Sequence, residues 1–160
     1  MSAEQKSRKY LAFRTGREEF ALPVANVREI IAGQQVTPLP ATPDYVMGLI
    51  NLRGRVMPVI DLGLRLAIPA VETRPGSRRA LIVVIQAAAG AGSLVGAMVD
   101  EVSEVISIHD QDVEPVSGFS HGLIEPRFAT AVARVRGSIL VLLDVNRILA
   151  RQEDGNGTGS

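Results

Sequence analysis

The chain has no cysteine among its 160 residues, which excludes disulfide bonds, a thiolate nucleophile and every metal site that needs a cysteine ligand. It has no tryptophan, two tyrosines and four phenylalanines, so the aromatic platforms on which nucleic-acid-binding barrels stack bases are scarce. Its net charge is zero, from 17 basic and 17 acidic residues. A nucleic acid or an anionic membrane therefore gains no overall electrostatic attraction.

Long apolar runs are also missing. The longest, such as residues 80–85 and 139–143, are far shorter than the roughly 20 residues of a membrane-spanning helix. Residues 1–9 are polar and charged, with no apolar stretch behind them that would make a signal peptide. From these features and the lack of cysteine we expect a soluble, cytoplasmic protein.

The composition is that of a globular domain, with 46% hydrophobic and 21% charged residues. Short segments rich in Val, Ile, Leu and Phe, separated by Gly and Pro turn signals, predict a mainly β fold. They cover residues 10–13, 20–24, 46–52, 56–60, 80–85, 94–99, 128–135 and 139–143. Helix is predicted only at 24–31, in a turn near Asp44, and at 144–152, where Asp144 can cap the first turn. We expect disordered tails at 1–7 and 153–160.

The second half of the chain repeats the pattern of the first in the same order. Residues 24–31, 36–38 and 53–61 correspond to 99–106, 113–115 and 136–144, respectively. The duplication predicts two similar, small, five-stranded barrels that share a core. We place them at roughly 15–75 and 76–140, with the terminal segments crossing over, inside one domain of residues 8–152.

No catalytic motif stands in the structural context that its chemistry needs. The glycines of residues 90–96 follow a strand, but their spacing is wrong for a phosphate loop and the residues after them are β-branched. Residues 118–122, Gly-Phe-Ser-His-Gly, match the G-x-S-x-G pattern, but no predicted strand leads directly into them as in a nucleophile elbow. No G-x-x-x-x-G-K-[ST] loop is present. His109 and His121 lie in turn-like surroundings without metal-ligand spacing. We expect no catalysis, no cofactor and no metal.

Three aspartates, Asp61, Asp100 and Asp144, could be imagined as carboxylates for acid–base chemistry. Asp61 and Asp144 hold equivalent positions in the repeat at strand ends, where aspartate commonly caps the next turn, so we interpret them as structural. A small nucleic-acid-binding barrel stays open as an alternative. Against it, Phe13 and Phe20 lie in apolar strand patterns typical of a core.

Several blocks of the sequence together carry a family likeness. They are the Gly-Leu-Ile-Asn-Leu-Arg-Gly block at 48–54 with its continuation to residue 62, and residues 10–13, 18–24, 27–31, 37–40, 43, 95–105 and 139–149. In pattern, order and length they resemble the CheW family of bacterial chemotaxis coupling proteins. The likeness spans the chain except for both tails.

This resemblance implies two intertwined, five-stranded, SH3-like barrels with a shared core and short helices, including a C-terminal one. It also implies a non-enzymatic adaptor that couples the cytoplasmic tips of chemoreceptors to the regulatory domain of the histidine kinase CheA. Such an adaptor is cytoplasmic, is recruited to membrane-associated receptor arrays that it helps to build, and is a monomer when isolated. No cofactor, nucleic acid or membrane insertion is implied.

In the family, the receptor tip lies in a groove between the barrels. Matching positions one at a time gives the receptor-binding candidates Val27, Glu29, Ile30, Gly48, Arg53 and Val105. Apolar residues such as Val27 and Ile30 are more often core than surface, and Gly48 could simply permit a bulge or a close backbone approach. The residues that bind the kinase stay unassigned.

Arg53-Gly54 and Arg136-Gly137 hold equivalent positions between two strands. Their glycines suit tight turns with positive φ. Arginine has no such turn advantage, so Arg53 is interpreted as a binding residue. The repeat leaves open that both arginines make the same internal salt bridge.

Two relatives compete with the simple assignment. In CheV a CheW-like domain precedes a receiver domain, and the regulatory domain of CheA is itself built like CheW. We expect a single-domain coupling protein, because 160 residues leave no room for a receiver or kinase domain. An excised domain of a CheV-type or CheA-type protein stays open, and so does the pathway that the protein serves.

Overall fold

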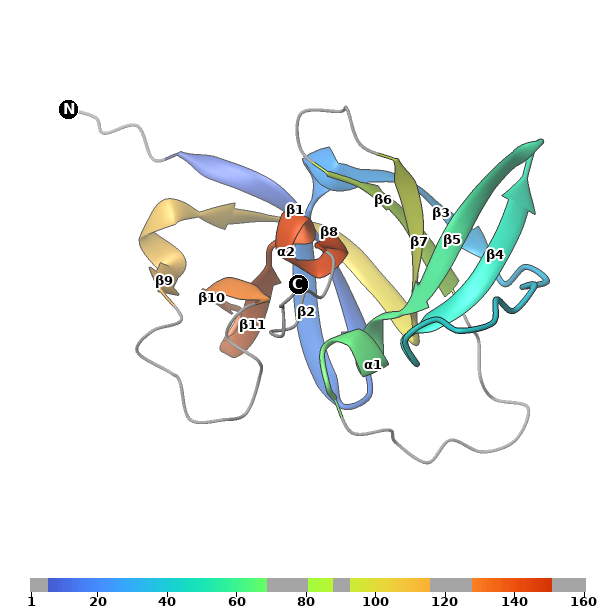
Figure 1. Ribbon diagram of the computed structural model, residues 1–160. Helices are drawn as coiled ribbons and strands as arrows, with labels where there is room; N and C mark the ends of the chain where they lie inside the picture. Colours follow the sequence, from blue (N-terminus) through green and yellow to red (C-terminus); the bar gives the residue numbers. More distant parts are fainter. Residues whose placement is uncertain (1–5, 69–80, 88–92, 116–127, 151–160) are drawn as a thin grey trace.

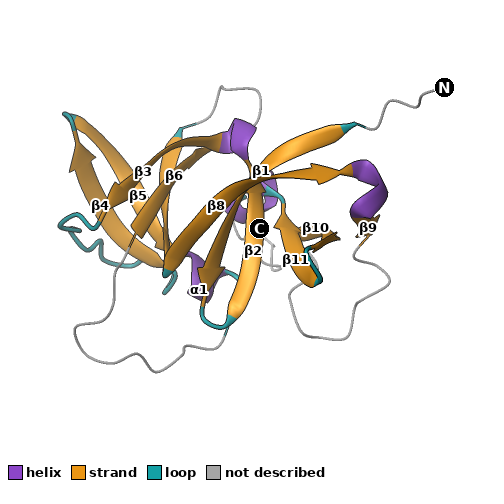
Figure 2. Cartoon of the chain, turned by 180° about the vertical axis from the view of Figure 1, so that it is seen from behind, coloured by secondary structure: helices purple, strands orange, loops and turns teal. Residues whose placement is uncertain are grey.

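The computed structural model describes residues 6–68, 81–87, 93–115 and 128–150, and most of them lie in two β-sheets that stand side by side (Figures 1 and 2). One sheet has six strands in the order β8-β1-β2-β11-β10-β9. They are β1 (Ser7–Thr15), β2 (Glu18–Pro23), β8 (Glu101–His109), β9 (Val113–Pro115), β10 (Ala129–Val135) and β11 (Ser138–Leu143). Neighbouring strands are antiparallel except β2 and β11, which are parallel.

The other sheet has five strands in the order β3-β6-β7-β5-β4. They are β3 (Val27–Ala32), β4 (Val46–Leu52), β5 (Arg55–Asp61), β6 (Leu81–Gln86) and β7 (Leu94–Val99). Only β5 and β7 are parallel. Short helical turns follow several of the strands: η1 (Val24–Asn26), α1 (Leu62–Arg65), η3 (Asp110–Asp112) and, after the last strand, α2 (Val145–Leu149).

The two sheets repeat one plan. Strands β3, β6, β7, β5 and β4 occupy the same order as β8, β1, β2, β11 and β10. The isolated β-bridge between Thr37 and Leu49 of β4 has the position in the five-stranded sheet that the β9–β10 pairing has in the six-stranded sheet. The N-terminal hairpin β1–β2 therefore takes, in the sheet of the C-terminal half, the place that β6–β7 takes in the other. This exchange interlocks the two halves of the chain.

One hydrophobic core lies between the sheets and takes side chains from both. Leu11, Phe13 and Phe20 enter it from the six-stranded sheet, and Val83 and Ile85 from the five-stranded one. The rings of Phe13 and Phe20 stack with centroids 5.9 Å apart. Burying each such side chain contributes about 1.5–3 kcal/mol.

Each sheet also curls around a smaller core of its own. Ala12, Ala21 and Leu142 point away from the shared core into one that only the six-stranded sheet lines. Met57 and Val84 do the same in the five-stranded sheet. Both faces of β1 are thus covered, which explains its continuous apolar run at residues 11–13.

The prediction of a mainly β fold with two similar units and a shared core is confirmed, with a short sixth strand added to one sheet. Strands β6 and β7 pair within the sheet of β3, β4 and β5, although the sequence prediction placed their residues in the second subdomain of 76–140. Ser7, predicted in a disordered tail, opens β1 opposite His109. Residues 1–5 and 153–160 lie outside the described part.

The predicted helix at 24–31 is wrong beyond its first turn. Only Val24–Asn26 is helical, and Val27–Ala32 is strand β3. The β-branched Val27, Ile30 and Ile31 favour a strand that pairs with β6. The same signal was missed in β8, the equivalent strand of the repeat, and β9 was missed because it has only three residues.

The two short α-helices meet where the halves join. The Asp61 carboxylate accepts a hydrogen bond from the backbone N–H of Leu64, and Asp144 accepts them from Asn146 and Arg147, so both capping predictions are confirmed. Arg65 of α1 is buried, with its guanidinium between the rings of Tyr45 and Phe128, 4.6 and 4.7 Å from their centroids.

Arg65 also holds the end of α2. Its Nε donates to the carbonyl of Ile148 at 2.9 Å and its Nη2 to that of Ala150 at 2.8 Å. A cation at the C-terminal carbonyls of a helix is favourable.

Across the described ranges, no helix is long and apolar enough to cross a membrane.

We expect a fragment of residues 1–75 to be unfolded or to aggregate. It contains β1 and β2 without β8 and β11, their partners, and it lacks β6 and β7 from the centre of the other sheet. A lone core of this size is marginal even when its sheet is complete. Amide NMR spectra and thermal melts, with the full chain as control, measure this. A soluble fragment with dispersed signals and a cooperative melt would contradict the interlocked fold.

Candidate protein-binding site

Two exposed apolar side chains lie at the margin of the shared core, one on each sheet. Ile30 on β3 is 41% exposed and Val105 on β8 is 54% exposed. Ile30 lies opposite Val83, and Val105 lies opposite Leu11. Directly opposite residues point to the same face of a sheet, and both partners belong to the shared core. Ile30 and Val105 therefore extend the core's apolar face to the surface; we call these two residues the apolar margin.

Val27 is half-buried, lies opposite Ile85 and packs against the shared core. The core interpretation therefore applies to Val27, whereas Ile30 is on the surface. Val27 borders the apolar margin and fixes the start of β3 against the core.

Arg53, at the tip of the β4–β5 hairpin, holds Glu29 of β3 in a bidentate ion pair. Its Nη1 donates to Oε2 at 2.9 Å and its Nη2 to Oε1 at 2.8 Å. β3 and β4 are the two edges of the five-stranded sheet. The ion pair therefore spans the gap between these two edges of the curled sheet. We call this gap the mouth of the sheet.

An equivalent ion pair spans the mouth of the six-stranded sheet. Arg136, at the tip of the β10–β11 hairpin, donates from Nη1 to Oε2 of Glu104 on β8 at 2.7 Å. Both arginines thus make the internal salt bridge that the sequence left open. Their side chains stay largely solvent-exposed, at 69% for Arg53 and 70% for Arg136.

Both arginines adopt a backbone conformation that is costly for them. Arg53 and Gly54 have φ of 54° and 83°, and Arg136 and Gly137 have 51° and 80°. Positive φ at both central residues is the type I′ hairpin turn, in which Asn or Gly usually precedes Gly. The premise that only the glycine belongs to the turn is therefore wrong. A non-glycine residue in this conformation is strained, whereas a fully exposed ion pair is screened by solvent and stabilises the fold little. Folding stability alone does not explain these arginines.

The ion pair sets the charge state of Glu29. Its hydrogen bond from Arg53 and the nearby positive charge hold the pKa of the Glu29 carboxyl below its ordinary value, and Glu29 raises the pKa of Arg53. The pair contributes to stability above the ordinary glutamate pKa and is lost as pH falls through the lowered pKa of the folded state. At neutral pH both side chains present full charges to a partner.

Gly48 is buried in β4, at a bulge between Val46 and Gly48 in the pairing with β5. Its φ is 145°, and a Cβ built there would lie 2.0 Å from the carbonyl oxygen of Thr37. Thr37 exchanges two backbone hydrogen bonds of 2.8 Å with Leu49. Gly48 therefore permits the close approach of the Thr37 segment to β4 and offers no side chain to a partner.

Three features escaped the sequence interpretation. Val56 and Ile139, equivalent residues just after the two turns, are 59% and 53% exposed. Their shared position in the repeat was the available signal. Arg65 carried a weaker sequence signal, as the charged residue of an otherwise apolar helical turn.

Of the two histidines, His109 is exposed and His121 lies outside the described residues. Within the described ranges, no three His, Asp or Glu side chains converge as a metal site would require.

We expect Gly48→Ala to lower the free energy of unfolding by about 3 kcal/mol or more, because strained φ and a clash with backbone act together. Gly54→Ala is the matched control. Gly54 also has positive φ, but its Cβ would meet nothing within 4 Å, so the loss should be about 1 kcal/mol. Denaturant unfolding of both variants measures the difference. Equal losses would show that the approach of Thr37 places no steric demand on residue 48.

Comparison with known proteins matches this architecture to one family. A family model described as a CheW-like domain matches residues 9–153. The chemotaxis protein CheW of Rhizobium meliloti (strain 1021) is 35% identical over 146 residues, covering 91% of this chain and 90% of that protein. The probable chemotaxis protein CheW of Rhizobium etli is 33% identical over 152 residues, covering 95% and 94%.

A solved structure agrees. The crystal structure of the scaffolding protein TtCheW from Thermoanaerobacter tengcongensis superposes with a TM-score of 0.75 at 29% identity, covering 87% of this chain and 90% of that one. The match of both sequence and fold extends over nearly all of the described strands. The chain belongs to the CheW-like domain family.

Proposed function

We propose that this chain is a non-enzymatic chemotaxis adaptor that binds the cytoplasmic tips of chemoreceptors and the regulatory domain of the histidine kinase CheA. Family membership over residues 9–153 supports the proposal, as do relatives named chemotaxis protein CheW that match along almost their whole length. The observation that carries it is the apolar margin, where Ile30 and Val105 stand exposed on different sheets of one core.

The apolar margin suits a helical partner. An amphipathic helix docks by placing apolar residues at i, i+3 and i+4 on an apolar surface, and a receptor tip is a coiled coil of helices. Contacts from both Ile30 and Val105 would seat such a helix across the two sheets.

Arg53 supplies the polar contact of this site. Two of its five guanidinium N–H groups are used by Glu29, and the rest are open to a receptor carboxylate or carbonyl. Glu29 holds the guanidinium in one orientation, which lowers the entropy lost on binding. Gly48 contributes by permitting the close approach of the Thr37 segment to β4, and Val27 contributes by packing beside the apolar margin.

The adaptor works in the cytoplasm, as a monomer when isolated, and joins membrane-associated receptor arrays through these partners. Its role needs no cofactor and no turnover. The same domain excised from a CheV-type or CheA-type protein would keep the CheW-like fold and differ in what is attached to it.

A nucleic-acid-binding role is disfavoured by the position of the aromatic residues. Phe13 and Phe20 are fully buried in the shared core, so neither offers a face on which a base could stack.

We expect Arg53→Asn to weaken binding to a receptor cytoplasmic fragment at least about tenfold, or 1.4 kcal/mol, with the melting temperature nearly unchanged. Asparagine suits the positive φ of this turn, so the substitution removes the side chain without straining the backbone. Arg136→Asn is the matched control, in the same turn of the other sheet, and should leave receptor affinity unchanged. Calorimetric titration of the three proteins measures both affinities.

A second pair of variants tests the apolar margin in the same titration. Val105→Ser should weaken receptor binding several-fold, whereas Ile139→Ser, at a site of nearly equal exposure, should not. If Arg53→Asn and Val105→Ser both bind receptor as tightly as the unchanged chain, the receptor site lies elsewhere and the assignment is overturned.

A further inference from the structure

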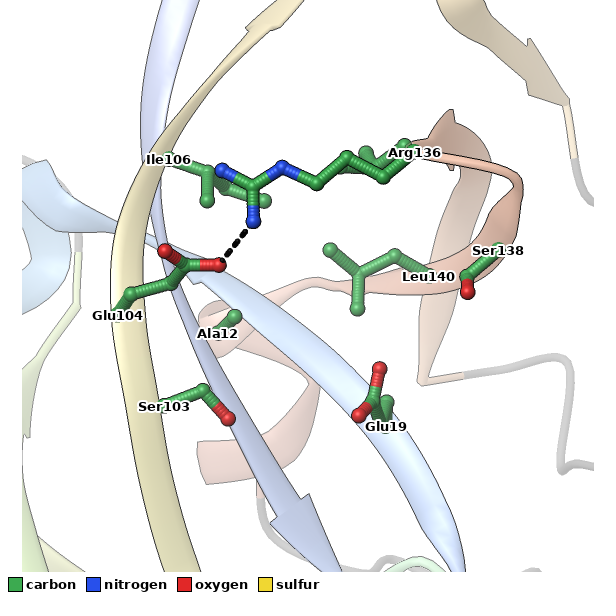
Figure 3. Close-up of a pocket in the computed structure, with 9 residues that line it drawn as sticks. Ala12, Glu19, Ser103, Glu104, Ile106, Arg136, Ser138 and Leu140 are labelled. Atoms are coloured by element: carbon green, nitrogen blue, oxygen red, sulfur yellow. Dashed lines mark hydrogen bonds and ion pairs between the residues drawn. The ribbon is translucent and has the colours of Figure 1, made fainter.

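A cavity of about 220 Å³ opens at the mouth of the six-stranded sheet (Figure 3). Ala12, Ile106 and Leu140 form its apolar floor. Arg136 reaches across one side to Glu104 on β8, and Glu19 points into the opening from β2 on the other side.

The repeat explains why this mouth is hollow. The register of the strands makes Ala12 the equivalent of Val84, and Glu19 the equivalent of Leu94. In the five-stranded sheet, Val84 is fully buried and Leu94 packs against the same small core. A smaller residue on the floor and a carboxylate at the rim thus stand where the five-stranded sheet has apolar side chains that pack in its small core.

The cavity favours a positive charge. Its two carboxylates, on Glu19 and Glu104, and its one guanidinium, on Arg136, leave one net negative charge. Arg136 is already paired with Glu104. Within the described ranges, no group donates a hydrogen bond to the Glu19 carboxylate. Arg14, opposite it in register and outside the cavity lining, attracts Glu19 electrostatically but donates its hydrogen bond to Glu101. One incoming cation would neutralise the site without breaking the existing ion pair.

The shape favours a charged group on an aliphatic stem. Lysine and arginine place their methylene groups on apolar surface while the charged end reaches a polar rim. In this cavity the stem would lie on Ala12, Ile106 and Leu140, and the charged end would meet Glu19. The hydroxyls of Ser103 and Ser138 also line the opening and can accept further N–H groups.

We propose that this cavity is a socket for one lysine or arginine side chain of the kinase's regulatory domain. The choice of the kinase over the receptor rests on the proposed function and on the two faces of β8. Val105 points to the shared-core face, with Leu11, whereas Ile106 points into the small core of the six-stranded sheet. A partner seated in the socket therefore leaves the apolar margin free.

Titration of the full chain with the kinase's regulatory domain tests the socket. Glu19→Gln should weaken binding about fivefold and reduce its dependence on salt, because one exposed charge pair is lost. Glu18→Gln is the matched control. It removes the same charge from the neighbouring exposed residue of β2, whose side chain points to the opposite face, and should change nothing.

Filling the socket is a second route to the same result. Ala12→Val and Glu19→Leu introduce the residue types found at the equivalent positions of the five-stranded sheet, and each should weaken kinase binding while receptor affinity is unchanged. Thermal melts identify any variant that fails to fold. If Ala12→Val or Glu19→Leu does not fold, the test of the socket rests on Glu19→Gln, which changes an exposed position.

The outcomes separate the socket from the proposed function. If the unchanged chain binds neither kinase nor receptor, the function fails. If it binds both, and Glu19→Gln equals Glu18→Gln, the socket is overturned and the function stands. If Glu19→Gln weakens receptor binding instead, the assignment to the kinase is overturned.

Discussion

Both β-sheets bury one face in the same hydrophobic core, and the N-terminal hairpin β1–β2 belongs to the sheet of the C-terminal half. Neither half can therefore complete its sheet or cover its core alone. The candidate binding site depends on this arrangement, because Ile30 and Val105 come from different sheets and are both at the edge of that one core. Arg65 strengthens the join by tying α1 to the end of α2.

Duplication has kept the plan of the two sheets and changed what their mouths contain. Each mouth is spanned by an arginine in a strained turn and a glutamate on the facing edge strand. In the five-stranded sheet Val84 and Leu94 pack in the small core, whereas their equivalents Ala12 and Glu19 line an acidic cavity in the six-stranded sheet. Residues that break a local backbone preference are typical of functional sites, which supports the proposed role of Arg53 in binding.

The sequence predicted the fold class, most strands, the shared core and the aspartate caps, because residue type, strand length and internal repetition are local signals. It predicted that terminal segments cross over between the two units, but it did not predict β3, because the pairing of Val27–Ala32 with β6 is a long-range contact. Resemblance supplied the candidate site residues. Sequence could not show what Gly48 is for, because that depends on how closely the Thr37 segment approaches β4. The cavity depends on Ala12 and Glu19 meeting across strands, which only the register reveals.

Hydrogen exchange of the full chain, with and without a receptor cytoplasmic fragment, tests most directly whether the apolar margin is the receptor site. The edge strands β3 and β8 carry Ile30 and Val105, so their amides should gain protection on binding, together with the Arg53 hairpin, while the Arg136 hairpin stays unchanged. Protection confined to β9, β10 or the Arg136 hairpin, with β3 and β8 unaffected, would contradict the account.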